Sequence, residues 1–258
     1  MSRPERAFRT PLLILKRRDF GEADRLLTVL TPGHGKLSVI AKGARKLAST
    51  KTGHVELFTR ADALIHRGRD FGIAVQVEQV APHLLLREDL QRGAYAGYAA
   101  ELVDRFVLEE GSDDGHAAAV FNLLDATFAR LSSATDDPRL VLRYYELHLL
   151  DHAGFRPELT ECVISHEAIQ PEDQFISYGA GGAVRPQAAH RSPTGLVPVS
   201  MQTLKLLRHL QRSHYDQVRA LQIPPDLHDD AERVLVGYVT FLLERQPDSL
   251  TFLRQLRS

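Results

Sequence analysis

Bulky apolar side chains alternate with small or polar ones along the first third of the chain. The alternation is plain in residues 73–78 and again in residues 36–42. A period of two residues is typical of strands with one buried and one solvated face. We therefore predict five strands, at about 8–18, 22–31, 36–43, 55–66 and 72–81.

Three of the predicted separators have the composition of turns or loops. They are PGHG at 32–35, the basic and glycine-bounded GARKLASTKTG at 43–53, and RGRDFG at 67–72. Five short antiparallel strands within so few residues favour a small closed barrel, of the OB-fold or the SH3-like type. The periodicity alone does not choose between these two barrels.

After Pro82 the hydrophobic period changes to that of a helix. Apolar residues recur three and four positions apart, which predicts helices at about 92–110, 116–132, 138–153, 200–213, 216–222, 229–245 and 249–256. The predicted helix at 138–153 carries signals at both ends, with Asp137 as N-cap before Pro138 and Gly154 at its C-terminal end. The periodicity therefore predicts an α-helical bundle for this part of the chain.

The change of period divides the chain into two predicted domains within an α+β multidomain fold. Residues 1–82 form the barrel and residues 83–258 the helical domain. Helical periodicity fails between Pro157 and Pro198. A structureless loop of this length is uncommon inside a compact domain. We therefore predict a small insert with its own organisation at about 158–196.

Charge is distributed unevenly between these two parts. The 258 residues carry 32 Lys and Arg against 33 Asp and Glu, but residues 1–80 hold 15 of the basic and 8 of the acidic residues. A basic segment of this size favours a polyanionic partner. The single cysteine, Cys162, and the lack of a long apolar stretch predict a soluble protein of the cytoplasm.

Three stretches of the sequence resemble one known family. DFGEADRLLTVLTPGHGKLSVIAKGARK at 19–46, RYYELHLLDHAGFRPELTEC at 143–162 and LVGYVTFLLERQPDSLTFLRQL at 235–256 are similar to the bacterial RecO recombination mediators. The resemblance implies an N-terminal OB-fold that binds single- and double-stranded DNA, followed by a helical domain. It also implies annealing of complementary strands, and partnership with RecR and single-stranded-DNA-binding protein in loading RecA.

The insert departs from the pattern of many relatives, in which two CxxC pairs form a four-thiolate zinc site. Their positions correspond here to Cys162, Ser165, Arg185 and Ala188. Structural zinc requires four Cys or His ligands, and adding His166 and His190 to Cys162 still leaves one ligand missing. We therefore predict a zinc-finger-like insert without metal, closed by apolar packing of Val163, Ile169, Phe175 and Val184.

Basic side chains of the predicted barrel are the candidates for DNA binding. They are Lys16, Arg17, Arg18, Arg25, Lys36, Lys42, Arg45, Lys46, Lys51, Arg67 and Arg69. Alternation places Lys36 and Lys42 on the non-core face of one strand. Among the aromatic residues, Phe20 and Phe71 lie near turns where a base could stack, whereas Phe8 and Phe58 are expected to fill the barrel.

The helical domain offers candidates of two other kinds. Arg143, Lys205, Arg208 and Arg212 could hold the carboxylates of the acidic tail that the family binds. His148, Asp151 and His152 lie within about one helical turn, so a metal-dependent hydrolase is an alternative, as is an RNA-binding OB module. We find no nucleotide-binding loop, dinucleotide fingerprint or nucleophile elbow, and therefore expect no enzyme activity and no cofactor.

Overall fold

The computed structural model describes residues 7–45, 54–107 and 115–256. The chain divides into two compact units, the first comprising Met1–Ala134 with Phe252–Ser258 and the second Thr135–Thr251. The hydrophobic period changes where the last barrel strand ends, at Ala81, but the boundary between the compact units comes later in the chain. Two long helices therefore belong to the same unit as the strands.

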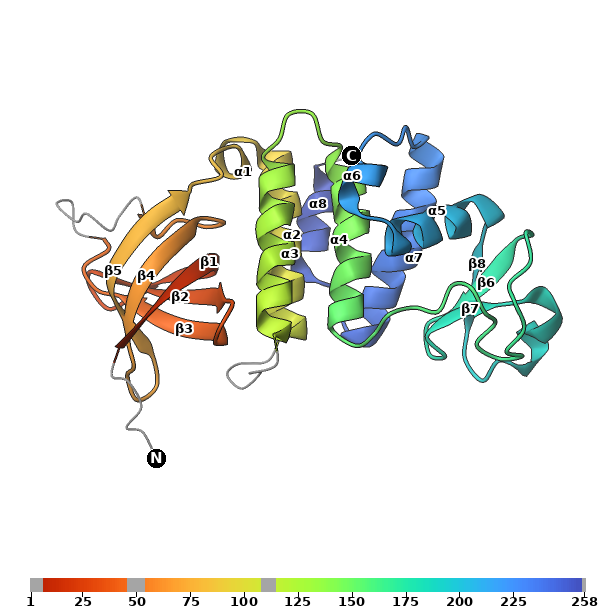
Figure 1. Cartoon of the computed structure of the whole chain (residues 1–258), viewed down its shortest axis with the longest axis horizontal. Coiled ribbons are helices and arrows are strands. Elements are labelled where there is room, and N and C mark those ends of the chain that lie inside the picture. The colour runs from red at the N-terminus through yellow and green to blue at the C-terminus, as the bar shows by residue number, and fades with distance from the viewer. Residues whose placement is uncertain (1–6, 46–53, 108–114, 257–258) are drawn as a thin grey trace. The chain divides into compact units, whose positions relative to one another are not determined.

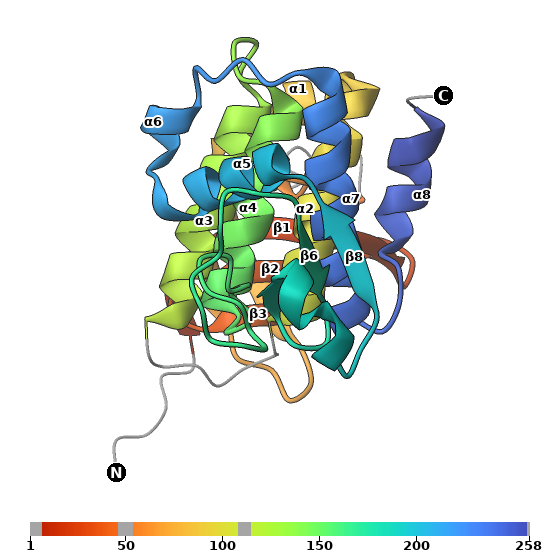
Figure 2. The same cartoon turned by 90° about the vertical axis from the view of Figure 1, so that its right-hand side faces the viewer.

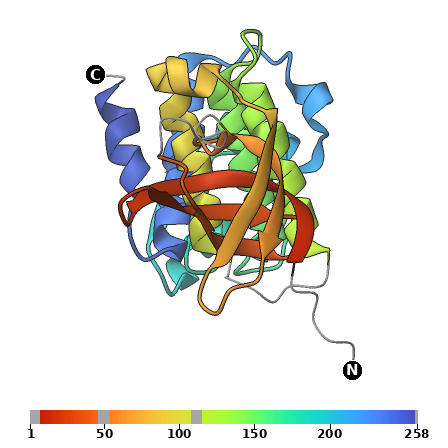
Figure 3. The same cartoon turned by 90° about the vertical axis from the view of Figure 1, so that its left-hand side faces the viewer.

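Five strands of the first unit form a closed barrel in the order β1-β2-β3-β5-β4 (Figures 1 and 3). They are β1 (Ala7–Phe20), β2 (Asp24–Thr31), β3 (Gly35–Ala41), β4 (Arg60–His66) and β5 (Gly72–Ala81). All neighbours are antiparallel except β3 and β5, which pair in parallel over three residue pairs, Val39↔Gly72 to Ala41↔Ala74. The sequence prediction of five strands is confirmed.

The barrel core follows from the alternation in the sequence. Leu27 and Val29 of β2 and Leu37 and Val39 of β3 point into one buried cluster, and Ile14 of β1 joins them. Each of these side chains has an exposed fraction of 9% or less. Burying a side chain of this size contributes on the order of 1.5–3 kcal/mol, so the period of two residues fixes which face of each strand lies inside.

The fourth strand begins later than predicted because the backbone is irregular at Phe58. This residue has a φ of 63°, a left-handed value that interrupts an extended strand. The segment still pairs with β1, since the Phe58 amide donates to the Ile14 carbonyl at 3.0 Å and the Ile14 amide donates to the Thr59 carbonyl at 3.1 Å. Phe58 thus lies at a bend beside the barrel.

Three helices follow the barrel in the first unit, namely α1 (Leu85–Glu88), α2 (Leu90–Phe106) and α3 (His116–Leu131). Asp89 caps α2 by accepting a hydrogen bond from the Arg92 amide at 3.0 Å. The α3 helix packs on the barrel through Phe128, whose ring lies 5.4 Å from that of Phe58, and through an ion pair between Asp125 and Arg60 at 2.6 Å. The sequence did not predict α1, because a single turn is too short to show a helical period.

The second unit is built on helices α4 (Pro138–His152), α5 (Met201–Arg212), α6 (Tyr215–Val218) and α7 (Pro225–Leu242). The chain leaves this unit within α8 (Asp248–Gln255). Both predicted end signals of α4 are confirmed. Asp137 accepts from the Arg139 amide at 2.8 Å, and Gly154 follows the helix with a left-handed φ of 78°.

The insert of the second unit has secondary structure of its own (Figure 2). Strands β6 (Gln174–Ser177), β7 (Gly182–Val184) and β8 (Leu196–Val199) form a sheet in the order β7-β6-β8, with a short 3-10 helix at Pro186–Arg191. Strands of three or four residues are too short for a periodicity argument. Across the described residues, no helix is both long and apolar enough to span a membrane.

Candidate nucleic-acid interface

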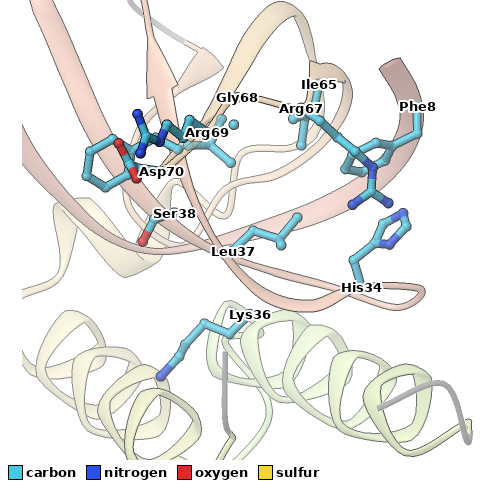
Figure 4. Close-up of a pocket in the computed structure, with 13 residues that line it drawn as sticks. Phe8, His34, Lys36, Leu37, Ser38, Ile65, Arg67, Gly68, Arg69 and Asp70 are labelled. Carbon is cyan, nitrogen blue, oxygen red and sulfur yellow. The ribbon is translucent and has the colours of Figure 1, made fainter. Parts of the chain in front are cut away.

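A groove of about 380 Å³ opens at the mouth of the barrel. Its lining comes from the start of β3, the β4–β5 loop at 67–71, and Phe8 of β1. The guanidinium of Arg67 lies 5.0 Å from the centre of the Phe8 ring, and the His34 ring lies 4.1 Å from it. Figure 4 shows Arg67 and His34 beside Phe8. The groove thus combines a cation with two rings, the groups that hold a phosphate and a base.

The β4–β5 loop supplies the accessible charge of this groove. Arg67 and Arg69 are both exposed, and neither forms an ion pair with another described residue. Gly68 is required inside the loop, because a Cβ there would approach the Phe71 carbonyl oxygen to 2.0 Å. The tight turn therefore presents two arginines that are separated by a single glycine.

On the outer face of the sheet, two predicted DNA-binding lysines are neutralised instead. Asp104 of α2 accepts a hydrogen bond from Lys16 at 2.6 Å and lies 3.3 Å from the Lys36 ammonium. The exposed fraction of Lys36 is 9%, and its side chain extends away from the groove toward the helices (Figure 4). Alternation placed Lys36 on the outer face, but α2 covers that face, so Lys36 is not available to a phosphate.

Burial opposes the ionisation of Asp104, yet its pKa is lowered overall. The hydrogen bond from Lys16 and the positive charges of Lys36 and Lys16 outweigh the desolvation of the carboxylate. The carboxylate therefore stays charged at neutral pH and contributes to the stability of the first unit.

Replacing Asp104 with Asn is expected to lower the free energy of unfolding by about 0.5–1.5 kcal/mol at pH 7. A carboxylate with a depressed pKa contributes stability that is present above its unfolded pKa of about 3.9 and is lost as the pH falls through its folded pKa. The difference between wild type and variant should therefore shrink at pH 3. Urea unfolding at both pH values measures it, with the exposed Asp62→Asn as control. A constant difference at both pH values would refute the assignment.

Three more of the predicted cations are paired within the first unit. Glu56 binds both Arg17 and Arg25, the latter at 2.9 Å, and Asp19 lies 3.4 Å from Arg45. Lys46 and Lys51 lie outside the described residues. Among the predicted DNA-binding cations in the described ranges, those that are exposed and have no ion pair to another described residue are Arg18, Lys42, Arg67 and Arg69. Of the predicted cations, Lys36, Arg67 and Arg69 line the groove, but the ammonium of Lys36 is bound to Asp104.

The aromatic residues are arranged partly as the sequence predicts. Phe20, with 39% of its surface exposed, and Phe71 are 6.1 Å apart at one end of the barrel. Phe8 is partly buried against the barrel core. The expectation that Phe58 fills the barrel is wrong, because its ring packs on Phe128 of α3 outside the core cluster. Phe8 and His34 of the groove come together only in the folded chain, and no local pattern predicts their contact.

The predicted partner-binding residues of the second unit have different environments. Arg143 has an exposed fraction of 3%, and its guanidinium binds Glu146 at 2.8 Å and Glu232 at 3.3 Å. It is therefore part of the interior of the unit. Arg208 donates from Nε to the Leu159 carbonyl, while Lys205 and Arg212 are exposed on α5.

Two residues of the hydrolase alternative, His148 and Asp151, contact other side chains or backbone of the second unit, and Asp151 and His152 are exposed. The Nε2 atom of His148 lies 3.1 Å from the Leu210 carbonyl, and its ring lies 4.0 Å from that of Tyr144. Burial lowers the pKa of His148. Asp151 binds Arg156 at 2.6 Å. Within the described ranges, no group of three or more His, Cys, Asp or Glu side chains is placed to hold a metal ion.

Cys162 is the centre of the insert. Its Sγ atom accepts hydrogen bonds from the Ser165 and Arg185 amides, both at 3.4 Å, and the cysteine is fully buried. Burial raises the pKa of the thiol, but these hydrogen bonds outweigh it and lower the pKa overall. Arg185 is paired with Glu167, and Ala188 has an exposed fraction of 4%. Ser165 and Arg185 thus lie at the Cys162 thiol, but Ser, Arg and Ala cannot supply the missing zinc ligands.

The four apolar side chains predicted to close the insert are buried or half-buried. Ile169 and Val184 are buried, and Val163 and Phe175 are half-buried. The insert is therefore expected to be stable without zinc. Dialysis against a chelator should leave the melting temperature unchanged to within about 1 °C, because a structural zinc would contribute binding free energy to folding. Near-stoichiometric zinc by elemental analysis of metal-replete protein would contradict this prediction.

Comparison with known proteins identifies the chain. Residues 6–83 match the family described as Recombination protein O N terminal, and residues 87–251 match Recombination protein O C terminal. A DNA repair protein RecO of Roseiflexus sp. (strain RS-1) is 40% identical over 253 residues, covering 98% of this chain and 87% of the relative. Another of Dehalococcoides mccartyi (strain CBDB1) is 33% identical over 250 residues, covering 97% and 96%.

The barrel, the helical region and the matches to known families together define a protein of DNA repair and recombination. The chain belongs to the recombination protein O family, RecO. The resemblance found in the sequence is confirmed.

Proposed function

We propose that the barrel is an OB-fold that binds single- and double-stranded DNA through the groove at its mouth. The observation that carries the proposal is the pairing of accessible arginines with rings, in which Arg67 lies over Phe8 while Arg69 stands exposed on the same loop. The closed order of five strands, with β3 parallel to β5, supports the OB-fold assignment.

DNA is held by its phosphates, so binding is tolerant of sequence. Arginines neutralise the backbone and release counterions, while the base edges stay free to pair with a second strand. Screening of phosphate repulsion lowers the cost of bringing complementary strands together. In this proposal the protein anneals strands without turnover chemistry and without a cofactor.

The proposal divides DNA binding and partner binding between two parts of the chain. Residues 1–82 act as the DNA-binding domain, and residues 83–258 act as the helical domain, with a metal-free, zinc-finger-like insert at about 158–196. Exposed Lys205 and Arg212 of α5, with Arg208 between them, receive the acidic tail of single-stranded-DNA-binding protein. Together with RecR, the protein helps load RecA onto DNA at the nucleoid, in the cytoplasm.

Strand annealing by the full chain tests the function. Complementary labelled oligonucleotides should anneal faster with the protein than without it, in the absence of ATP. The affinity for a single strand should fall with salt, with a log–log slope of about 0.7 per phosphate contact. Oligonucleotides that stay unshifted even at low salt would overturn the proposal. Competition of RNA against DNA at matched salt distinguishes an RNA-binding module.

A further inference from the structure

A second cavity of about 490 Å³ lies between the outer face of the barrel and α2. Its apolar wall is formed by Leu15, Leu26, Leu57 and Phe58, and Gly97 of α2 lines it too. Lys16, Arg17 and Arg18 also line this cavity, which we name the α2 slot. The slot is therefore apolar in one part and cationic in another.

Gly97 leaves space in the slot that packing does not explain. Glycine in a helix interior costs about 1 kcal/mol relative to alanine. At Gly93, one turn earlier, a Cβ would approach the Leu86 carbonyl oxygen to 2.7 Å, so that glycine is required. At Gly97 a Cβ would meet nothing within 4 Å. The missing side chain therefore keeps the slot open rather than relieving a clash.

Phe58, on the apolar wall, is held in a strained conformation. Its left-handed φ of 63° is rare for a bulky residue and costs on the order of 1–3 kcal/mol. Hydrogen bonds to β1 and the contact with Phe128 hold it there. Strain of this kind concentrates at binding sites, and here it places an aromatic ring beside the cavity.

Charge decides what the slot can hold. Lys16 is bound by Asp104 and Arg17 by Glu56, whereas Arg18 is exposed and has no ion pair with another described residue. Arg18 can bind an anion, and the apolar wall beside it can contact a ring that is attached to this anion. The slot therefore suits a ligand that carries both groups. Ser38 of β3 lines both the slot and the groove at the barrel mouth, so one extended ligand can reach both.

We propose that the α2 slot receives one base of a single strand bound along the barrel, with the phosphate of that nucleotide at Arg18. This inference rests on the proposed function, since it requires a bound strand. The hydroxyls of Thr28 and Ser38 and the carboxylate of Glu101, which also lies 3.6 Å from Arg105, line the slot and can pair with the base edge.

Filling the slot without changing any charge tests the proposal. Gly97→Leu places a side chain in the cavity, and Gly97→Met repeats the test with a flexible side chain should leucine prevent folding. Gln91→Leu, at an exposed position of the same helix, is the matched control. The probes are a dC 12-mer and an abasic 12-mer with the same number of phosphates, each measured over a range of salt.

Stacking contributes about 1–3 kcal/mol per base, so Gly97→Leu should weaken binding of the dC 12-mer by about 5- to 150-fold. The Gly97→Leu variant should bind the abasic strand with the affinity and the salt slope of wild type. The Gln91→Leu variant should bind both probes with the affinity and the salt slope of wild type. Equal affinity of wild type and Gly97→Leu for the dC 12-mer would overturn the base slot while leaving backbone binding intact. Failure of wild type to bind either probe would instead overturn the proposed function.

A different occupant gives a different result. If a labelled acidic peptide ending in Phe binds wild type but not Gly97→Leu, while both proteins bind the dC 12-mer equally, the slot is a peptide site and the proposal is wrong.

Discussion

Replacing Arg67 and Arg69 together with alanine is expected to weaken binding of a single-stranded oligonucleotide by on the order of 10- to 100-fold at 50 mM salt. Both arginines lie on the β4–β5 loop at the groove, and both are exposed. Two lost phosphate contacts should also reduce the log–log salt slope by about 1.4. Fluorescence anisotropy over a salt series measures both quantities.

A control with the same loss of charge separates local contact from net charge. Arg191 and Arg254 are exposed and lie outside the barrel, so the double alanine variant at these positions should keep the wild-type slope. If both double variants bind alike, or if the loop variant keeps its slope, then the β4–β5 loop does not contact phosphate. The melting temperature of each variant confirms that the protein is folded.

The largest loss of stability is expected on replacing Arg143 with alanine. This change removes the guanidinium that lies 2.8 Å from the fully buried carboxylate of Glu146. Breaking a buried ion pair by removing one partner costs about 3–5 kcal/mol, because a charge is left uncompensated away from water. Urea unfolding followed by circular dichroism measures the loss, which is expected in the transition of the second unit.

The double variant Arg143→Met and Glu146→Leu tests the cause. Removing both charges leaves no buried carboxylate unpaired at this position, so most of the stability should return. A double variant that is as unstable as Arg143→Ala would show that packing volume, rather than charge, accounts for the loss. If the Arg143→Ala variant is as stable as wild type, the buried ion pair does not stabilise the unit, and Arg143 is again a candidate for binding a partner protein.

The contrast between Lys36 and Arg67 shows what the alternation of residues can and cannot predict about a cation. Alternation correctly assigns Lys36 to the outer face of β3, opposite Leu37 and Val39. It does not reveal that Asp104, far along the chain, covers that face and binds the lysine. Arg67 lies in a loop with no period at all, yet it is this cation that reaches the groove.

The helical part gives the same lesson. The end signals of α4 are local, since Asp137 and Gly154 act on the backbone next to them, and both were predicted correctly. The role of Arg143 depends on Glu232 of another helix, so its burial could not be predicted. Strands β6, β7 and β8 are too short to carry a period, and the sequence predicted only that the insert is organised.

By itself, the sequence determined the five strands, most of the helices, the barrel core and the family. These features depend on the period of apolar residues, on helix caps and on continuous stretches of similar residues, all of which are local along the chain. The tertiary structure decided which cations remain available, where the groove and the α2 slot lie, and which arginine is buried. Each of these depends on side chains that are distant in sequence and meet when the chain folds. A single carboxylate, such as that of Asp104, can then bind a lysine and make it unavailable to a phosphate.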